Sequence, residues 1–260
     1  MKSTSGMHFV ALDHLRALAT FMVFVWHFAG PTATPQSPPL PPLTIFSQGY
    51  TGVAVFMTLS GFLFARLLEG KTIYYGKFIW NRALRLLPLL ITVFAIQGAI
   101  LAVQGAPLAP YFRDLLQGVL RPCWPNGGWS IAVELHFYLL IPLILWLFRR
   151  STSSLYWILC ANILCRVVLW AWAGEIQRLA YLTLAGRLDQ FLLGVQATRW
   201  RITGGAGSAV AALALITVSV AFYCLEACGV FYNCPSFPSP RVFWVFLPTL
   251  EALCYSLIIS

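Results

Sequence analysis

The chain contains 260 residues, of which 59% are hydrophobic and only 10% are charged. A globular domain in water carries about 25% charged residues, so this chain has too few to cover a water-facing surface of its size. Its 17 Lys and Arg outnumber its 8 Asp and Glu and give a formal net charge of +9, but most of that charge lies beside apolar runs. The composition excludes a soluble enzyme, a disordered chain and an ordinary nucleic-acid-binding protein. It predicts an integral membrane protein with no nucleic-acid partner.

Apolar runs of about membrane-spanning length recur along the chain. Because a helix needs roughly 20 mostly apolar residues to cross the hydrocarbon core of a bilayer, we expect an all-α fold with about eight transmembrane helices. The expected spans are 9–29, 50–68, 84–104, 130–148, 154–172, 179–198, 206–225 and 242–260. No internal repeat or soluble segment separates them, so residues 1–260 are expected to form a single domain. The last run is still apolar at Ser260, which favours a domain that lacks C-terminal helices of a longer protein.

Basic residues mark one side of the predicted membrane. If the N-terminus is cytoplasmic, Lys2, Arg16 and most of the other basic residues that flank the spans fall inside, as the positive-inside rule requires. We therefore expect a multi-pass protein of a cell membrane, surrounded by membrane lipid, with its N-terminus in the cytoplasm. The first run could be read as a cleaved signal peptide, but Asp13 and His27 fit that role poorly, and a retained helix is favoured.

Ionisable residues inside the predicted spans are the first candidates for function, because each is costly in hydrocarbon. Arg16 and His27 are 11 residues apart, close to three helical turns, so they share one face of the first helix at about 16 Å along its axis. Imidazole is the side chain that most readily gains and loses a proton near neutral pH, so His27 could act as a general base. It could also be a hydrogen-bonded packing residue at the outer interface.

A pair of arginines lies at the start of the third expected helix. Arg82 and Arg85 are three residues apart and therefore share a face of that helix. Such a pair can bind phosphate groups through charge-assisted hydrogen bonds. Cytoplasmic anchoring of a membrane helix would also place basic residues here.

Acidic residues in the later spans allow several interpretations. Glu134 enters an apolar helix within its first turns, where a carboxylate gains from the helix dipole; it could position an acceptor hydroxyl, orient an imidazole or pair with a buried arginine. Arg187 and Asp189 are two residues apart and cannot face each other on a helix, so each needs a partner in a substrate or on another helix. Ser60 is a poor candidate nucleophile, because small residues in mid-helix usually permit close helix packing. No Cys or His spacing indicates a metal site.

Three segments carry sequence blocks that occur together in one family. They are ALDHLRALATFMVFVWH (11–27), GYTGVAVFMTLSGFLFARLL…KFIWNRALRLLP (49–88) and WSIAVELHFYLLIPL (129–143). In this order they resemble the blocks of the membrane-bound acyltransferase 3 family, whose members include bacterial O-antigen and Nod-factor acetyltransferases. GRLDQFLLGV (186–195) is a weaker fourth match.

The resemblance implies roles for particular residues. The positions that match the family's arginine-x10-histidine spacing, its arginine pair and its glutamate are Arg16, His27, Arg82, Arg85 and Glu134. His14 and Asn81 depart from the pattern, because the family usually has Gly at the first position and many members have Arg at the second.

The activity implied by the resemblance is O-acyl transfer. Family members take an acyl group, usually acetyl, from cytoplasmic coenzyme A and place it on a carbohydrate hydroxyl, often across the membrane. By this resemblance the donor is acetyl-CoA or another acyl-CoA, the acceptor is a carbohydrate or glycolipid, no cofactor is permanently bound, and the location is a bacterial inner membrane.

The same resemblance assigns the candidate site. His27 would be the base or the acyl carrier, and Glu134 would bind acceptor hydroxyls or orient His27. Arg16, Arg82 and Arg85 would hold the phosphates of coenzyme A. The alternative function is a multi-helix transporter or flippase for a glycan or lipid, because such a protein would also place ionisable residues near the middle of the membrane.

Overall fold

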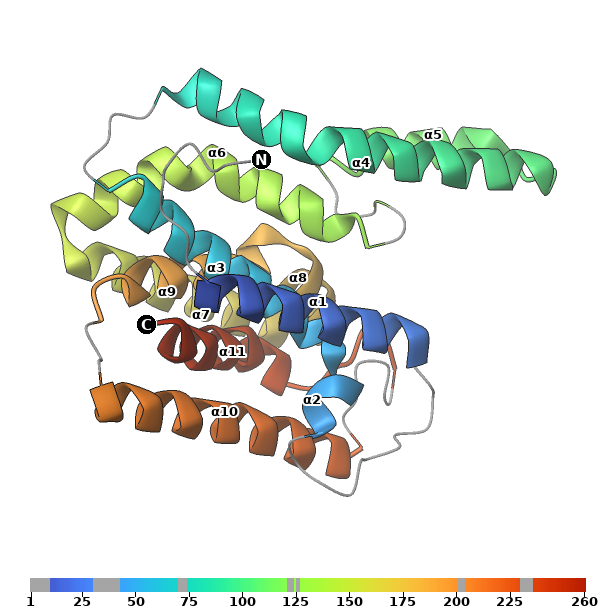
Figure 1. Ribbon diagram of the computed structural model, residues 1–260. Helices are drawn as coiled ribbons and strands as arrows, with labels where there is room; N and C mark the ends of the chain where they lie inside the picture. The colour runs from blue at the N-terminus through green and yellow to red at the C-terminus, as the bar shows by residue number, and fades with distance from the viewer. Residues whose placement is uncertain are drawn as a thin grey trace.

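The computed structural model describes residues 10–29, 43–69, 74–120, 124, 127–200, 204–229 and 236–260. Within these residues the chain forms helices joined by turns and loops, and no strand (Figure 1). The all-α class predicted from the sequence is therefore confirmed for the described part of the chain.

The helices divide into long and short ones. The long helices are α1 (Val10–Ala29), α3 (Gly52–Leu67), α4 (Tyr75–Val103), α6 (Trp129–Arg150), α7 (Thr152–Ala173), α10 (Gly204–Ala227) and α11 (Phe243–Ile259). The shorter ones are α2 (Thr44–Ser47), the 3-10 helix η2 (Gly49–Thr51), α5 (Leu108–Gln117), α8 (Gln177–Leu182) and α9 (Leu184–Ala197).

Five helical segments of the described chain are long and apolar enough to cross a membrane. They are Gly49–Leu67, Tyr75–Val103, Trp129–Arg150, Ser153–Ala173 and Gly205–Ala227, which correspond to the second, third, fourth, fifth and seventh expected spans. The first expected span is occupied by α1, which is not among the five, and the eighth by α11, which has only 17 residues. The expected number of eight spans is therefore not confirmed.

The prediction of one continuous helix over 179–198 is wrong. The backbone of Thr183 is extended, with φ −119° and ψ 159°, so that α8 ends before it and α9 begins after it. The Thr183 hydroxyl accepts a hydrogen bond of 3.2 Å from the Gly186 amide, which caps the N-terminus of α9. Gly186 makes the tight corner possible, because a Cβ there would lie 2.2 Å from the carbonyl oxygen of Leu179.

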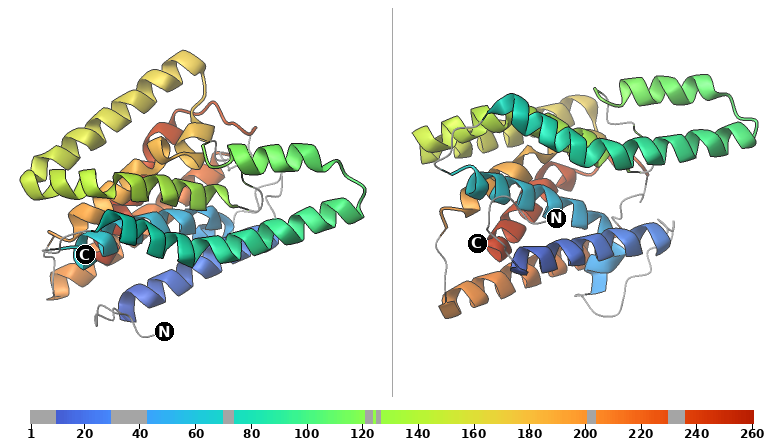
Figure 2. Two further views of the ribbon diagram at one scale, coloured as in Figure 1. Left: turned by 90° about the horizontal axis from the view of Figure 1, so that it is seen from above. Right: turned by 45° about the horizontal axis from the view of Figure 1, so that its top comes forward.

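Helix α4 also begins earlier than expected. It starts at Tyr75 instead of residue 84, so Arg82 and Arg85 lie within the helix and not at its beginning. The C-terminal half of α4 projects beyond the other helices, together with the antiparallel α5 (Figures 1 and 2). The Tyr111 hydroxyl of α5 donates to the Phe94 carbonyl of α4 at 2.7 Å and ties the two helices together. Trp124, which follows α5, donates to the Leu115 carbonyl of α5 at 2.8 Å and packs its ring 5.6 Å from that of Phe94.

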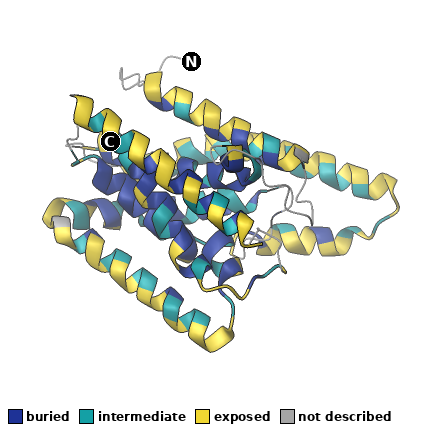
Figure 3. Ribbon diagram, turned by 90° about the horizontal axis from the view of Figure 1, so that it is seen from below, coloured by how far each residue is buried: buried dark blue, intermediate teal, exposed yellow. Residues whose placement is uncertain are grey.

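The buried centre of the protein is formed by α3, α9 and α11, whereas α4, α7 and α10 expose most of their residues (Figure 3). Two glycines let α3 and α9 approach closely. A Cβ at Gly61 would lie 2.2 Å from the Phe191 carbonyl oxygen, and one at Gly194 would lie 2.1 Å from the Thr58 carbonyl oxygen. The packing role predicted for the small residues of α3 is therefore confirmed at Gly61, where backbone meets backbone.

Gly61→Ala should destabilise the protein, because the added methyl group would force α3 away from α9. Overpacking of this kind costs roughly 1–3 kcal/mol, so the thermal unfolding midpoint in detergent micelles should fall. Gly76→Ala is the matched control, since no described atom lies within 4 Å of a Cβ at that position. Equal midpoints for the two variants would contradict this account of the helix crossing.

Candidate functional site

A cavity of about 540 Å³ lies where the C-terminal end of α1 meets η2, α3, α4, α8 and the N-terminal end of α6. Its walls include four aromatic rings, those of Trp26, Tyr50, Trp129 and Tyr181. Aliphatic side chains of α1, α3, α4 and α6 complete most of the remaining wall. Among the described residues that line it, His27 is the side chain suited to proton transfer near neutral pH.

The imidazole of His27 is oriented by its own helix. Its Nδ1 lies 2.7 Å from the carbonyl oxygen of Val23, one turn earlier in α1. A carbonyl oxygen can only accept a hydrogen bond, so in the neutral ring Nδ1 carries the hydrogen and Nε2 carries the free lone pair. The ring is exposed, and Nε2 is therefore available to take a proton from a molecule in the cavity.

A second group of polar residues gathers on α3, α4 and α6. One oxygen of Glu134, Oε1, accepts a hydrogen bond of 3.3 Å from the Ser60 hydroxyl and a short one from the Tyr138 hydroxyl. Arg82 interacts electrostatically with Glu134 and Tyr138, and also with the guanidinium groups of Arg16 and Arg85. Arg82 is thus within electrostatic range of Glu134 and of the other two arginines, while Arg16 itself forms an ion pair of 3.2 Å with Asp13.

Arg82 is the partly buried member of this arginine group. Its guanidinium carbon lies 4.8 Å from the ring centroid of Phe64 and 5.6 Å from that of Phe78, distances at which a cation is attracted to the ring face. Its Nε is buried and has no hydrogen-bond partner among the described residues. Because a buried donor without an acceptor is costly, an anion that could accept this hydrogen bond would be stabilised here.

The arginine group lies close to the His27 cavity along two helices. Leu89 lines the cavity and follows Arg85 by four residues, while Ile131 lines it and precedes Glu134 by three. These separations of three and four residues span roughly 4.5–6 Å along a helix axis. Arg85 and Glu134 therefore lie about one turn from the cavity that contains His27, whereas Arg82 precedes Leu89 by seven residues, or about two turns.

His27 and Glu134 take different hydrogen-bond partners. The imidazole bonds to Val23 of its own helix, and the carboxylate bonds to Ser60 and Tyr138. The geometry therefore gives no support to Glu134 as the residue that orients His27. The catalytic and phosphate-binding roles of these residues stay predictions.

Arg187 and Asp189 each have a partner on another helix. Asp189 forms a two-pronged ion pair with Arg166 of α7, with N–O distances of 2.5 and 3.2 Å. Arg187 lies 4.0 Å from Glu251 of α11. Glu251 was not predicted from the sequence as a functional residue. It is nevertheless the lone acidic residue of the last apolar run, and an ionisable residue inside an expected span is costly there just as Glu134 is.

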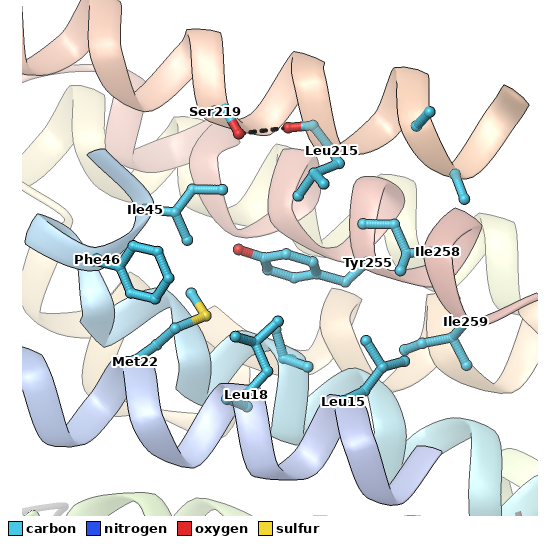
Figure 4. Close-up of a pocket in the computed structure, with 14 residues that line it drawn as sticks. Leu15, Leu18, Met22, Ile45, Phe46, Leu215, Ser219, Tyr255, Ile258 and Ile259 are labelled. Carbon is cyan, nitrogen blue, oxygen red and sulfur yellow. Dashed lines mark hydrogen bonds between the residues drawn. The ribbon is translucent and has the colours of Figure 1, made fainter. Parts of the chain in front are cut away.

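A second cavity, of about 410 Å³, lies between α1, α2, α3, α10 and α11 (Figure 4). Its walls are apolar apart from two hydroxyl groups that already have partners. Ser219 donates to the carbonyl oxygen of Leu215 at 2.7 Å, and Tyr255 shares a hydrogen bond of 2.6 Å with Thr51. We find no acid, base or nucleophile among its described lining residues that could carry a reaction.

Comparison with known proteins gives one match. Residues 9–257 match the model of the acyltransferase 3 family, which is described as an acyltransferase domain. No curated protein and no solved structure matches the chain.

The contact between His27 and Val23 predicts a defined tautomer. In protein labelled with ¹⁵N-histidine, the neutral His27 ring should show a protonated Nδ1 and an unprotonated Nε2, because Val23 offers only an acceptor. Nitrogen NMR of the detergent-solubilised protein measures this directly, and a His27→Ala sample identifies the signals. A neutral ring protonated at Nε2 would contradict the geometry.

Proposed function

Because the chain belongs to the acyltransferase 3 family, we propose that it transfers an acyl group, most simply acetyl, from acyl-CoA to a hydroxyl of a carbohydrate or glycolipid. Family membership and the apolar helices make the protein a multi-pass membrane acyltransferase. The donor, the acyl group, the acceptor and the residue roles are the proposal. The observation that carries it is the cavity containing His27, which lies about one helical turn from Arg85 and Glu134 and about two turns from Arg82.

The arginine group supports acyl-CoA as the donor. Coenzyme A carries several phosphate groups, and arginine binds phosphate through paired charge-assisted hydrogen bonds. Arg16, Arg82 and Arg85 supply the positive charge, and the buried Nε–H of Arg82 has no acceptor among the described residues. With the phosphates held there, the long flexible arm of coenzyme A would carry the thioester along α4 to the cavity.

His27 would activate the acceptor. Its Nε2 takes the proton from the acceptor hydroxyl while the hydroxyl oxygen attacks the thioester carbonyl carbon. The new C–O bond forms, the C–S bond breaks, and the coenzyme A thiolate leaves and receives the proton from the imidazolium. Attack of Nε2 itself on the thioester would give an acyl-imidazole, and this second route depends on the same residue.

Glu134 would act on the donor side of the site. It holds Tyr138 and Ser60 and lies within electrostatic range of Arg82, so it can balance the arginine charge while the site is empty. We propose this role for Glu134 in place of orienting His27, because the Val23 carbonyl already orients that ring.

The proposed location is a bacterial inner membrane with the N-terminus in the cytoplasm. Basic residues concentrate on the side of Lys2 and Arg16, which the positive-inside rule places in the cytoplasm. The arginine group would then face the compartment that contains acyl-CoA, and His27 would lie deeper in the membrane or towards its far side.

His27→Ala should abolish acyl transfer, because loss of the general base lowers the rate by roughly 10²–10⁴-fold. The measurement is the O-acetyl content of surface glycans in a deletion strain, with the gene restored as wild type or as the variant at equal expression. His136→Ala is the matched control: His136 also bonds a backbone carbonyl, that of Val119 at 2.6 Å, but does not line the cavity. Normal acetylation with His27→Ala would refute the mechanism.

Arg82→Gln should weaken acyl-CoA binding by roughly 10-fold or more, since it removes a charged hydrogen-bond donor to phosphate. Binding of coenzyme A to the purified protein by calorimetry tests this. Arg150→Gln serves as the control for loss of one positive charge, because Arg150 is exposed and stacks on Trp146 at the other end of α6. Failure of the wild-type protein to bind coenzyme A would remove the proposed donor and favour a transporter.

A further inference from the structure

A buried charged network lies directly behind the aromatic wall of the His27 cavity. Arg187 on α9 is 1% exposed and Glu251 on α11 is 2% exposed, so neither charge meets solvent or lipid. The proposed mechanism uses neither residue. Because uncompensated buried charges cost several kcal/mol, the contacts that keep them in place indicate what they do.

The contacts of Arg187 lead to the cavity wall. Its Nε donates a hydrogen bond of 2.8 Å to the carbonyl oxygen of Tyr181. Its guanidinium carbon lies 4.4 Å from the ring centroid of Tyr181 and 5.4 Å from that of Trp129. Both rings line the cavity that contains His27 and lie 4.8 Å apart. One buried cation therefore fixes two neighbouring wall residues from behind.

Glu251 holds the guanidinium group in this position. Its Oε2 lies 4.0 Å from Arg187 and accepts a hydrogen bond of 3.1 Å from Gln190, which in turn accepts one of 3.2 Å from Arg187. Its Oε1 accepts a hydrogen bond of 2.6 Å from Thr51, the residue directly after Tyr50 of the cavity wall. The carboxylate thus links η2, α9 and α11 behind the aromatic rings.

A second buried ion pair on α9 has contacts of a different kind. Arg166 and Asp189 are buried to the same extent and lie closer together, at 2.5 Å. Their other hydrogen-bond partners are Asn162, Thr249 and the Gly186 carbonyl, and none of these residues lines the His27 cavity. This pair joins helices, whereas the Arg187–Glu251 pair joins helices and also touches the cavity wall.

We propose that Arg187, held in place by Glu251, is the positioning residue of the His27 cavity. By fixing Tyr181 and Trp129 it sets the shape of the wall against which the acceptor lies and narrows the approach to His27 from the cavity side. The importance of this cavity rests on the proposed function, but the positioning itself is a property of the folded protein.

The test measures access to His27 without any substrate. Purified full-length chain is treated with diethyl pyrocarbonate, and modification of His27 is followed by peptide mass spectrometry relative to His14, an exposed residue of the same helix. In Arg187→Lys and Glu251→Gln, loosening of the aromatic wall should raise the relative rate at His27 by about threefold or more. The matched controls, Arg166→Lys and Asp189→Asn, should leave that relative rate unchanged even where they lower the thermal unfolding midpoint.

Two results would overturn the proposal: an unchanged His27 rate in folded Arg187→Lys and Glu251→Gln, or an equal rise in the two control variants. If neither of the first two variants folds, Thr51→Val replaces them, because it removes one hydrogen bond to Glu251 and keeps both charges. An unchanged rate in that variant would count equally against the proposal. Since the assay contains no acyl donor or acceptor, absence of acyl transfer would refute the proposed function without altering this result.

Discussion

A charged side chain buried among apolar helices must find its partner within the protein, and the central helices are arranged to provide one. Asp189 meets Arg166, Arg187 meets Glu251, and hydroxyl and amide groups of neighbouring elements add further hydrogen bonds to these charges. Such pairs contribute little net free energy compared with apolar packing. Their cost when broken is large, however, so they fix which helix faces which.

The close packing of the central helices also depends on glycine. The polar partners on α9, α11 and η2, which leads directly into α3, can reach one another only if these elements are close, and the two glycines at the α3–α9 crossing permit that approach. The outer helices have no comparable requirement. They expose broad apolar surfaces, as expected for helices whose neighbours are lipid chains.

The sequence predicts features that depend on one helix at a time. Apolar length located the five segments that can span a membrane, and helical spacing placed Arg82 beside Arg85 on one face of α4. Features that depend on contacts between several helices could not be predicted from the sequence. The break at Thr183 arises because the α8–α9 corner packs backbone on backbone at Gly186. The hydropathy of residues 179–198 carries no information about that contact, so the break could not be predicted from it. Likewise, Ser60 of α3 could be recognised as a partner of Glu134 only after α3 and α6 had been placed side by side, whereas Tyr138 is the i,i+4 neighbour of Glu134 on α6 itself.

The hydrogen bond between His27 and Val23 has a consequence for how such a site can evolve. In many hydrolases a separate carboxylate fixes the histidine tautomer, so the acid–base pair depends on two distant parts of the chain keeping their relative positions. Here the orienting acceptor belongs to the main chain of the same helix, and any residue at position 23 supplies it. The orientation of the His27 ring is thus set within α1 itself. The surrounding helices and loops can diverge without disturbing that orientation.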